Sequence, residues 1–222
     1  LLAAPEWTEA DLSSLRMMAI GSTDVPVALI EAVHARGIPV VQVYGATETS
    51  PTAIYQTADI AAATVGSIGK AGKCCDIRIT GDDGAELPVG EVGEIRVRGD
   101  NILTRYWNNE AASTESIADG WFRTGDMARV DAAGLYWFAD RLKHVIISGG
   151  ENISSVEVEG VLMGHPDVNL AAVVAQPDEK WGEVPCAFVE LSGKATEDEL
   201  IAHAKTRLAR YQRPKKVIFG EL

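Results

Sequence analysis

The sequence predicts a protein of mixed α/β and α+β class, with a small β-barrel-like region in its middle. In the first third, apolar runs at 15–20 and 38–43 lie on either side of a helical pattern, in the order of a β-α-β unit. From residue 66 onwards, short apolar stretches alternate with turns rich in glycine and aspartate, which favours small strands. Beyond residue 140, two helix-start patterns enclose two strand-like runs, which indicates an α+β unit.

The β-α-β pattern has its own start and stop signals. Ser22, Thr23 and Asp24 offer helix caps, Pro26 suits the first turn of a helix, and Gly37 is a natural helix end. Two apolar strands joined by one helix are expected to run parallel with a right-handed crossover. Ligands of open α/β sheets bind beyond the carboxyl ends of the strands, so we expect the loops at 21–23 and 44–48 to line one crevice.

The remaining two thirds carry turn and cap signals as well. Strands are expected near 77–79, 92–97, 125–130 and 134–139, with a hairpin turn at 131–134. Ser154-x-x-Glu157 and Thr196-x-x-Glu199 are capping-box patterns ahead of two helices. Between these helices, strands are expected at 169–175 and 184–191, and the second helix is expected to end in Lys205, Arg207 and Arg210.

Composition argues against several classes of protein. The 222 residues are 46% apolar and 23% charged, as in an ordinary soluble globular protein, and no apolar stretch reaches the roughly 18 residues of a transmembrane segment. The net charge of −12 argues against a nucleic-acid partner but not against a nucleotide, which needs only local donors. Cys74, Cys75 and Cys186 show neither metal nor disulfide spacing, so we expect packed thiols and a cytoplasmic protein.

Five short motifs follow one another along the chain. They read YGATE at 44–48, GWFRTGD at 120–126, DRLK at 140–143, ISGGENI at 147–153 and YQRPK at 211–215. In that order they resemble the adenylate-forming, or AMP-binding, superfamily, which includes acyl-CoA synthetases, adenylation domains of peptide synthetases and firefly-type luciferases. The resemblance covers essentially the whole chain. GGENISSVEVE at 149–159 and DEKWGE at 178–183 are most similar to fatty-acyl and related CoA ligases.

This resemblance implies a function and a domain organisation. The function is that of a ligase that uses ATP and Mg²⁺ to join a small carboxylic acid, a fatty or similar apolar acid, to AMP, and then passes the acyl group to CoA. Residues 1–140 are expected to be the C-terminal part of a large adenylation domain, with an α/β nucleotide-binding portion at 1–65 and a β-rich portion at 66–140. Residues 141–222 are expected to form a mobile α+β cap domain. A homodimer is kept open as a further partner.

The YGATE stretch carries residues suited to a nucleotide. Tyr44 offers a flat face on which adenine can stack, and Gly45 lets the backbone approach a ligand closely. Thr47 can donate a hydrogen bond to a phosphate oxygen. Glu48 is a hard oxygen ligand suited to the Mg²⁺ that bridges ATP phosphates. The alternative is a hairpin or helix entry with Thr47 as a cap and no ligand.

Four further residues complete the expected nucleotide site. Gly21 and Ser22 lie at the other strand end, and an ionised Asp126 can accept both hydroxyls of a ribose. Arg141 can reach the ribose or a phosphate as a fork of donors. We expect these residues to converge with the YGATE stretch on one crevice. The alternatives are an aspartate in a β-turn for Asp126 and a surface ion pair with Asp140 for Arg141.

The resemblance also implies a hinge and a CoA site. Lys143 matches the hinge at which the C-terminal domain of the family swings between adenylation and thioester formation. Its alternative is a solvated surface lysine. The residues expected to meet CoA are Gly149, Gly150, Trp181, Tyr211, Arg213 and Lys215. Their alternatives are a tight turn for the two glycines and packed aromatic or exposed charged side chains for the other four.

Two family features are not found between Leu1 and Leu222. Members carry a Ser/Thr/Gly-rich phosphate loop upstream of the YGATE stretch and a catalytic lysine in a short segment beyond Arg-Pro-Lys. We therefore expect the chain to be the C-terminal portion of a synthetase, truncated before that lysine and inactive by itself. Two other functions remain open, an adenylation domain that loads a carrier protein and a catalytically silent nucleotide-binding fragment.

Overall fold

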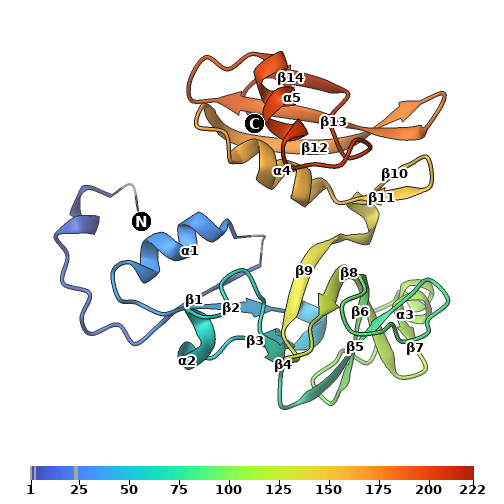
Figure 1. Cartoon of the computed structure of the whole chain (residues 1–222). Coiled ribbons are helices and arrows are strands. Elements are labelled where there is room, and N and C mark those ends of the chain that lie inside the picture. The colour runs from blue at the N-terminus through green and yellow to red at the C-terminus, as the bar shows by residue number, and fades with distance from the viewer. Residues whose placement is uncertain (1, 3, 23–24) are drawn as a thin grey trace. The chain divides into compact units, whose positions relative to one another are not determined.

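The computed structural model of the chain describes residue 2, residues 4–22 and residues 25–222. The chain separates into two units, Leu1–Phe138 and Ala139–Leu222 (Figure 1). Sheets dominate both units, with a few short helices packed on them, which confirms the mixed α/β and α+β class. The helix caps expected at Thr23 and Asp24 lie outside the described residues, and the expected domain limits at 140 and 141 stay a prediction.

The first unit begins with the predicted β-α-β arrangement. Strands β1 (Met18–Gly21) and β2 (Val40–Tyr44) pair in parallel and are connected through helix α1 (Val27–His34). The helix buries Ile30 and Val33 in a core that it shares with both strands. Two details of the prediction were wrong. Strand β1 starts at Met18 instead of Leu15, because the preceding residues do not pair with β2, and Pro26 immediately precedes α1 instead of forming its first turn.

Two short strands and a one-turn helix complete the first sheet. Strands β3 (Ile54–Tyr55) and β4 (Lys70–Ala71) add to the sheet antiparallel, in the order β1-β2-β3-β4, and helix α2 (Ala58–Ala61) lies between them in the chain. Their shortness explains why no periodic pattern in the sequence indicated them.

The rest of the first unit is a five-stranded sheet. It contains β5 (Cys75–Thr80), β6 (Gly93–Gly99), β7 (Ile117–Ala118), β8 (Trp121–Val130) and β9 (Tyr136–Arg141), in the order β5-β6-β8, with β7 and β9 paired to β8. Helix α3 (Glu110–Ser116) starts at Asn109, whose side chain accepts a hydrogen bond from the Ala112 amide. The predicted turn at 131–134 does join β8 to β9. Buried Ile79 and Ile95 pack with Ile54 of the first sheet, so the two sheets share one core.

The second unit packs two helices against a five-stranded sheet. Its strands are β10 (Ile146–Ser148), β11 (Glu151–Ile153), β12 (Val168–Asp178), β13 (Gly182–Leu191) and β14 (Lys216–Phe219), in the order β11-β10-β13-β12, with β14 parallel to β13. Helices α4 (Ser155–Met163) and α5 (Glu197–Lys205) contribute Val158, Leu162 and Leu200 to the core, all fully buried. The two long strands and both helices were predicted from the sequence.

Both predicted helix starts are capped by side chains. Ser154 Oγ accepts a hydrogen bond from the Glu157 amide at 3.2 Å, and Thr196 Oγ1 accepts one from the Glu199 amide at 3.4 Å. A reciprocal bond closes the box only at the second start, where Glu199 Oε2 accepts from the Thr196 amide at 2.8 Å.

The end of α5 differs from the prediction. The helix stops at Lys205, so Arg207 and Arg210 lie beyond its end. The chain turns there because Leu208 is buried in the core of the unit.

The helices among the described residues are too short or too polar to span a membrane.

A two-residue glycine turn joins β10 to β11. Ser148 pairs with Glu151, and the intervening Gly149 and Gly150 have φ of +61° and +90°. Positive φ at both central residues is a feature of type I′ hairpin turns, which favour glycine. A Cβ on Gly149 would lie 2.7 Å from the ring of Trp181, whereas a Cβ on Gly150 would meet open space. Gly149 therefore has a packing reason as well as a backbone reason to be glycine.

We predict that Gly149→Ala destabilises the second unit more than Gly150→Ala. Both substitutions force a residue with a Cβ into the left-handed region, which costs roughly 1–2 kcal/mol. Only Gly149→Ala also overlaps the Trp181 ring, which adds about 1 kcal/mol or more. Urea unfolding of the two variants measures the difference, and equal losses would show that Trp181 moves aside without cost.

Candidate active site

The ends of β1 and β2 lie side by side, as the sequence predicted for the two loops that follow them. Gly21 is in register with Val43, so the chain leaves both strands at the same edge of the sheet. A Cβ on Gly21 would lie 2.3 Å from the carbonyl oxygen of Val43, which only glycine avoids. Ser22 follows at φ +71° and is exposed. This edge therefore presents Gly21 and Ser22 next to the YGATE stretch.

A single 3-10 turn, Thr47–Thr49, displays Thr47 and Glu48 just beyond β2. The buried Thr49 holds this turn, because its Oγ1 accepts from the Ala46 amide at 2.9 Å and donates to the Pro51 carbonyl at 2.7 Å. A Cβ on Gly45 would lie 1.8 Å from that same Pro51 oxygen, so Gly45 is required by the turn itself. The capping role considered for Thr47 belongs to Thr49, and Thr47 is exposed.

Tyr44 and Asp126 are joined by a hydrogen bond although 82 positions separate them. The phenol Oη donates to Asp126 Oδ2 at 2.8 Å, and both side chains are half-buried. The bond connects the carboxyl end of β2 in the first sheet with β8 in the second sheet. The structure thus brings together the two residues for which the sequence suggested contacts with adenine and ribose.

Asp126 is presented by an irregularity in β8. Arg96 pairs with Arg123 and Glu94 with Met127, so Thr124, Gly125 and Asp126 together lie opposite one residue of β6. Such bulges re-aim side chains beside functional sites. Thr124 Oγ1 donates to the Ile95 carbonyl at 2.8 Å and accepts from the Asp126 amide at 3.1 Å. Gly125 adopts φ +69° and allows the chain to turn there.

Buried Glu94 supports the bulge, and sequence reasoning missed it. Its Oε1 accepts from the Gly125 amide at 3.2 Å, and its Oε2 pairs with Arg96 at 3.3 Å and Arg123 at 3.2 Å. A buried carboxylate needs such partners. Glu94 alternates with Arg96 along β6 like an ordinary exposed charge, so nothing in the local pattern marks it as buried.

Tyr106 contacts Glu48, and sequence reasoning missed it too. Its Oη donates to Glu48 Oε1 at 2.9 Å. Two further bonds fix the same region, from the Leu103 amide to the Glu48 carbonyl at 2.9 Å and from Asn101 Nδ2 to the Thr49 carbonyl at 2.8 Å. No spacing rule connects positions 58 residues apart, so only the folded chain reveals this contact.

Arg141 and Lys143 belong to the second unit and are both exposed. Lys143 is the central residue of a 3-10 turn, Leu142–His144, between β9 and β10. Asp140 is 1% exposed, and its carboxylate accepts from the Arg141 amide at 2.6 Å and from the Ser155 amide at 2.7 Å. The carboxylate of Asp140 is therefore used at the start of α4, and the role of the Arg141 side chain stays a prediction.

The residues expected to meet CoA also lie in the second unit. Gly149 and Trp181 are neighbours, since the Gly149 amide donates to the Trp181 carbonyl at 2.8 Å and the indole is 45% exposed. Arg213 donates to the carbonyls of Leu208 at 3.1 Å and Lys205 at 3.4 Å, so it satisfies backbone groups at and beyond the end of α5.

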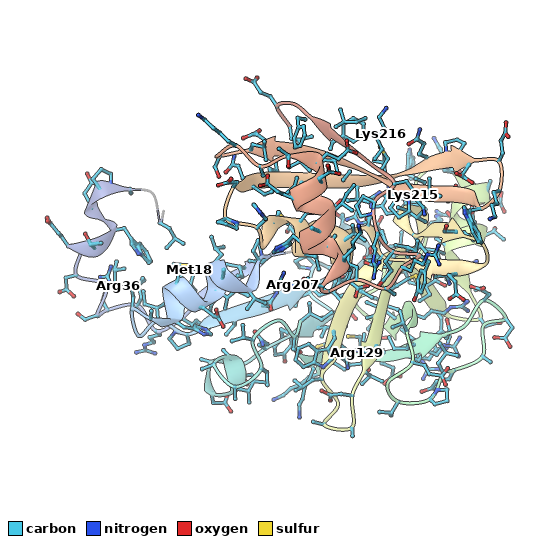
Figure 2. All side chains as sticks on the ribbon, turned by 45° about the horizontal axis from the view of Figure 1, so that its top comes forward. Met18, Arg36, Arg129, Arg207, Lys215 and Lys216 are labelled. Carbon is cyan, nitrogen blue, oxygen red and sulfur yellow. The ribbon has the colours of Figure 1, made fainter. Side chains whose placement is uncertain are left out.

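The other residues expected to meet CoA lie at the surface of the second unit. Tyr211 is exposed, and Lys215 is exposed just before β14 (Figure 2). Gly150 is exposed at the tip of the glycine turn. Their roles toward CoA stay predictions.

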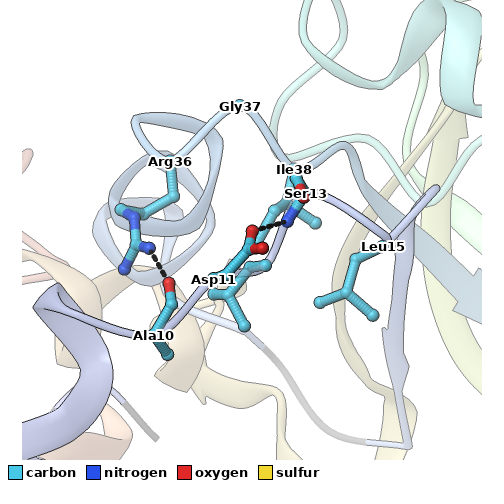
Figure 3. A pocket seen from close by; sticks show the side chains of 8 residues that line it. Ala10, Asp11, Ser13, Leu15, Arg36, Gly37 and Ile38 are labelled. Carbon is cyan, nitrogen blue, oxygen red and sulfur yellow. Dashed lines mark hydrogen bonds between the residues drawn. The ribbon is translucent and has the colours of Figure 1, made fainter.

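A pocket of about 250 Å³ lies at the opposite edge of the first sheet. Residues 10–13, 15 and 36–38 line it, which places it at the amino ends of β1 and β2. Figure 3 shows Arg36 donating to the Ala10 carbonyl and Asp11 accepting from the Ser13 amide, at 2.8 and 3.0 Å. None of the predicted site residues lines this pocket, so it is not the nucleotide crevice expected from the sequence.

Two family models match the chain. The model of the AMP-binding enzymes matches residues 1–107, and the model of the C-terminal domain of the AMP-binding enzymes matches residues 157–222.

Known CoA ligases are similar to the chain over its whole length. It is 48% identical to the indoleacetate–CoA ligase of Aromatoleum aromaticum, over 99% of this chain and 43% of that protein. It is 43% identical to the feruloyl-CoA synthase of an Amycolatopsis species, over 100% of this chain and 45% of that protein. The chain therefore spans less than half the length of these relatives.

A solved structure has the same fold. The o-succinylbenzoate CoA synthetase of Bacillus subtilis, in complex with its acyl-adenylate intermediate, matches 97% of this chain and 45% of its own with a TM-score of 0.91 and 37% identity. The same enzyme in complex with ATP and a magnesium ion matches with a TM-score of 0.89. Since family models match both parts of the chain and the fold is shared over nearly its full length, the chain belongs to the family of AMP-binding enzymes.

Proposed function

We propose that the protein containing this chain is an ATP-dependent acyl-CoA ligase. In its first half-reaction, a carboxylate oxygen of the acid bonds to the α-phosphorus of ATP and pyrophosphate leaves. In the second, the sulfur of CoA bonds to the acyl carbon and AMP leaves. The relatives with CoA ligase names, all at least 43% identical, support this reaction class.

The bond between Tyr44 and Asp126 is the observation that carries the proposal. It places an aromatic ring and a carboxylate at the edge of a parallel strand pair, where α/β sheets bind ligands. The phenol O–H lies in the plane of its ring, so this bond holds the Tyr44 ring by its edge, and adenine would stack on a face of that ring. Asp126 accepts from Tyr44 at Oδ2, and the several acceptor sites of an ionised carboxylate would suit the two hydroxyls of a ribose.

The turn after β2 suits the phosphates. Thr47 offers a hydroxyl donor and Glu48 a carboxylate, both from one short turn beside the Gly21 and Ser22 loop. The described residues contain no group of three or more His, Cys, Asp or Glu side chains that would hold a metal by themselves. This fits Mg²⁺, which is usually bound through one or two carboxylates and the phosphates of the substrate. When bound, Mg²⁺ would supply positive charge at the phosphates, with Glu48 as its ligand from this chain.

The second unit would supply the transfer half-reaction. Arg141 offers a fork of donors for the ribose or phosphate, and Lys143 provides the turn between β9 and β10 at which the unit would rotate. The exposed indole of Trp181, the glycine turn and the segment with Tyr211, Arg213 and Lys215 would meet CoA. Rotation at Lys143 would separate Asp140 from Ser155, so their hydrogen bond would exist in only one of the two poses.

The substrate would be a carboxylic acid with an apolar body. The sequence suggested a fatty or similar acid, and the names of three kinds of relative suggest an aromatic acid as well. Incubating the full-length protein with ATP, CoA and a panel of both kinds of acid tests the proposal. Thioester and AMP should form in equal amounts. Transfer to a carrier-protein thiol but not to CoA would support the carrier-loading alternative, and nucleotide binding without turnover would support the silent one.

We predict that Asp126→Ala in the full-length protein lowers the efficiency of ATP–pyrophosphate exchange at least about tenfold. A hydrogen bond to a charged acceptor is worth roughly 1.5–3 kcal/mol, and Asp126 would make two to ribose. Tyr44→Phe is the matched comparison, because it keeps the ring and removes only the bond that orients Asp126, so its loss should be smaller. An exchange rate unchanged by Asp126→Ala would contradict the ribose assignment.

We predict that Lys143→Pro preserves adenylation and abolishes transfer to CoA. Proline locks φ near −65° and would hold the unit in one pose. Lys143→Ala, which keeps backbone freedom, should retain both half-reactions. The measurements are pyrophosphate exchange and thioester formation from preformed acyl-adenylate. A surface lysine without a hinge role would leave the proline variant with equal losses in both half-reactions, or with none.

A further inference from the structure

The carboxylate of Glu48 is held on one side only. Tyr106 Oη donates to its Oε1 at 2.9 Å, and no described residue bonds to Oε2. Glu48 stands on a three-residue turn that is too short to restrict the direction of a long side chain. The contact with Tyr106 therefore fixes which oxygen of Glu48 remains for a ligand.

The segment that carries Tyr106 is itself fixed to the same turn. The Leu103 amide and the Asn101 side chain bond to the carbonyls of Glu48 and Thr49 at 2.9 and 2.8 Å. On the other side, the Tyr106 amide donates to Ser113 Oγ of α3 at 2.9 Å. Tyr106 is thus anchored at both ends of its segment, so its hydroxyl reaches Glu48 from a defined direction.

The proton of the bond between Tyr106 and Glu48 belongs to the phenol. An ionised carboxylate can only accept hydrogen bonds, so the Tyr106 O–H is the donor and Glu48 Oε1 is the acceptor at 2.9 Å. The bond therefore occupies Oε1 with a donor from a defined direction.

We propose that Tyr106 is a positioning residue that holds Glu48 by Oε1 and thereby aims Oε2 at the Mg²⁺ bound with ATP. This inference rests on the proposed function, in which Glu48 is the magnesium ligand of this chain. Hydrogen-bonded partners of a ligating carboxylate orient it and tune metal affinity. Tyr106 acts only through Glu48 and touches neither ATP nor the acid.

Tyr106→Phe is the matched test, because it removes one hydroxyl and keeps the ring and the backbone bond to Ser113. Nucleotide affinity of the full-length protein is measured without acid substrate, by displacement of a fluorescent ATP analogue, in EDTA and at rising Mg²⁺. We expect the affinity in EDTA to be unchanged. The Mg²⁺ concentration that gives half of the gain in affinity should rise about tenfold, in line with loss of a hydrogen bond to a charged group.

Glu48→Gln and the double variant complete a double-mutant cycle. If Tyr106 acts through Glu48, the double variant should show no larger shift in Mg²⁺ dependence than Glu48→Gln alone. Tyr136→Phe is the control, since it removes a phenol whose hydroxyl bonds the Ile77 carbonyl in the core, and it should not change the Mg²⁺ dependence.

Three results would overturn the inference. They are an unchanged Mg²⁺ dependence in Tyr106→Phe, additive shifts in the double variant, and equal losses of affinity with and without Mg²⁺, which would indicate a merely structural role. If the nucleotide affinity of the wild-type protein does not rise with Mg²⁺ at all, the proposed function itself is contradicted, because it assigns Glu48 as the ligand of the Mg²⁺ bound with ATP. The wild-type titration therefore separates the two failures.

Discussion

The hydrogen bond between Tyr44 and Asp126 is the interaction on which the candidate site depends. It connects the end of a parallel strand pair with a bulge in a separate antiparallel sheet. On each side of the bond, a buried side chain supports the backbone. The turn after Tyr44 is held by buried Thr49, and the bulge before Asp126 is held by buried Glu94. Neither residue would be placed by its own strand alone.

Several glycines that suggest ligand contact also have a reason inside the fold. Gly21, Gly45 and Gly149 would each bring a Cβ into close contact with a carbonyl oxygen or an aromatic ring. Gly150 differs, because its surroundings are open and only its positive φ requires glycine. A glycine in a motif is therefore compatible with a packing role and a ligand role at once. Only substitutions that separate stability from binding distinguish the two.

The start of the second unit combines a buried, hydrogen-bonded carboxylate with an exposed turn. Buried Asp140 accepts bonds from the amides of Arg141 and Ser155, and Ser154 Oγ donates to the Ala139 carbonyl. Lys143 lies between these partners in an exposed turn. Because a buried carboxylate needs its hydrogen bonds, breaking the bonds of Asp140 would cost free energy. A hinge at Lys143 would work against these bonds.

Much of this protein was determined by its sequence alone. Periodicity and turn chemistry identified β2, α1, the hairpin at 131–134 and both capped helices, because these features arise from neighbours a few positions apart. Motif order identified the family, since five stretches in a fixed order are specific. The strands β3, β4 and β14 are too short to show a periodic pattern in the sequence. The predicted end of α5 was wrong because the burial of Leu208 in the core ends the helix earlier. Only the tertiary structure revealed that Glu94 supports the Asp126 bulge and that Tyr106 holds Glu48. These hydrogen bonds join positions 29 to 58 residues apart. Such contacts form only when the chain folds, so no spacing pattern in the sequence indicates them.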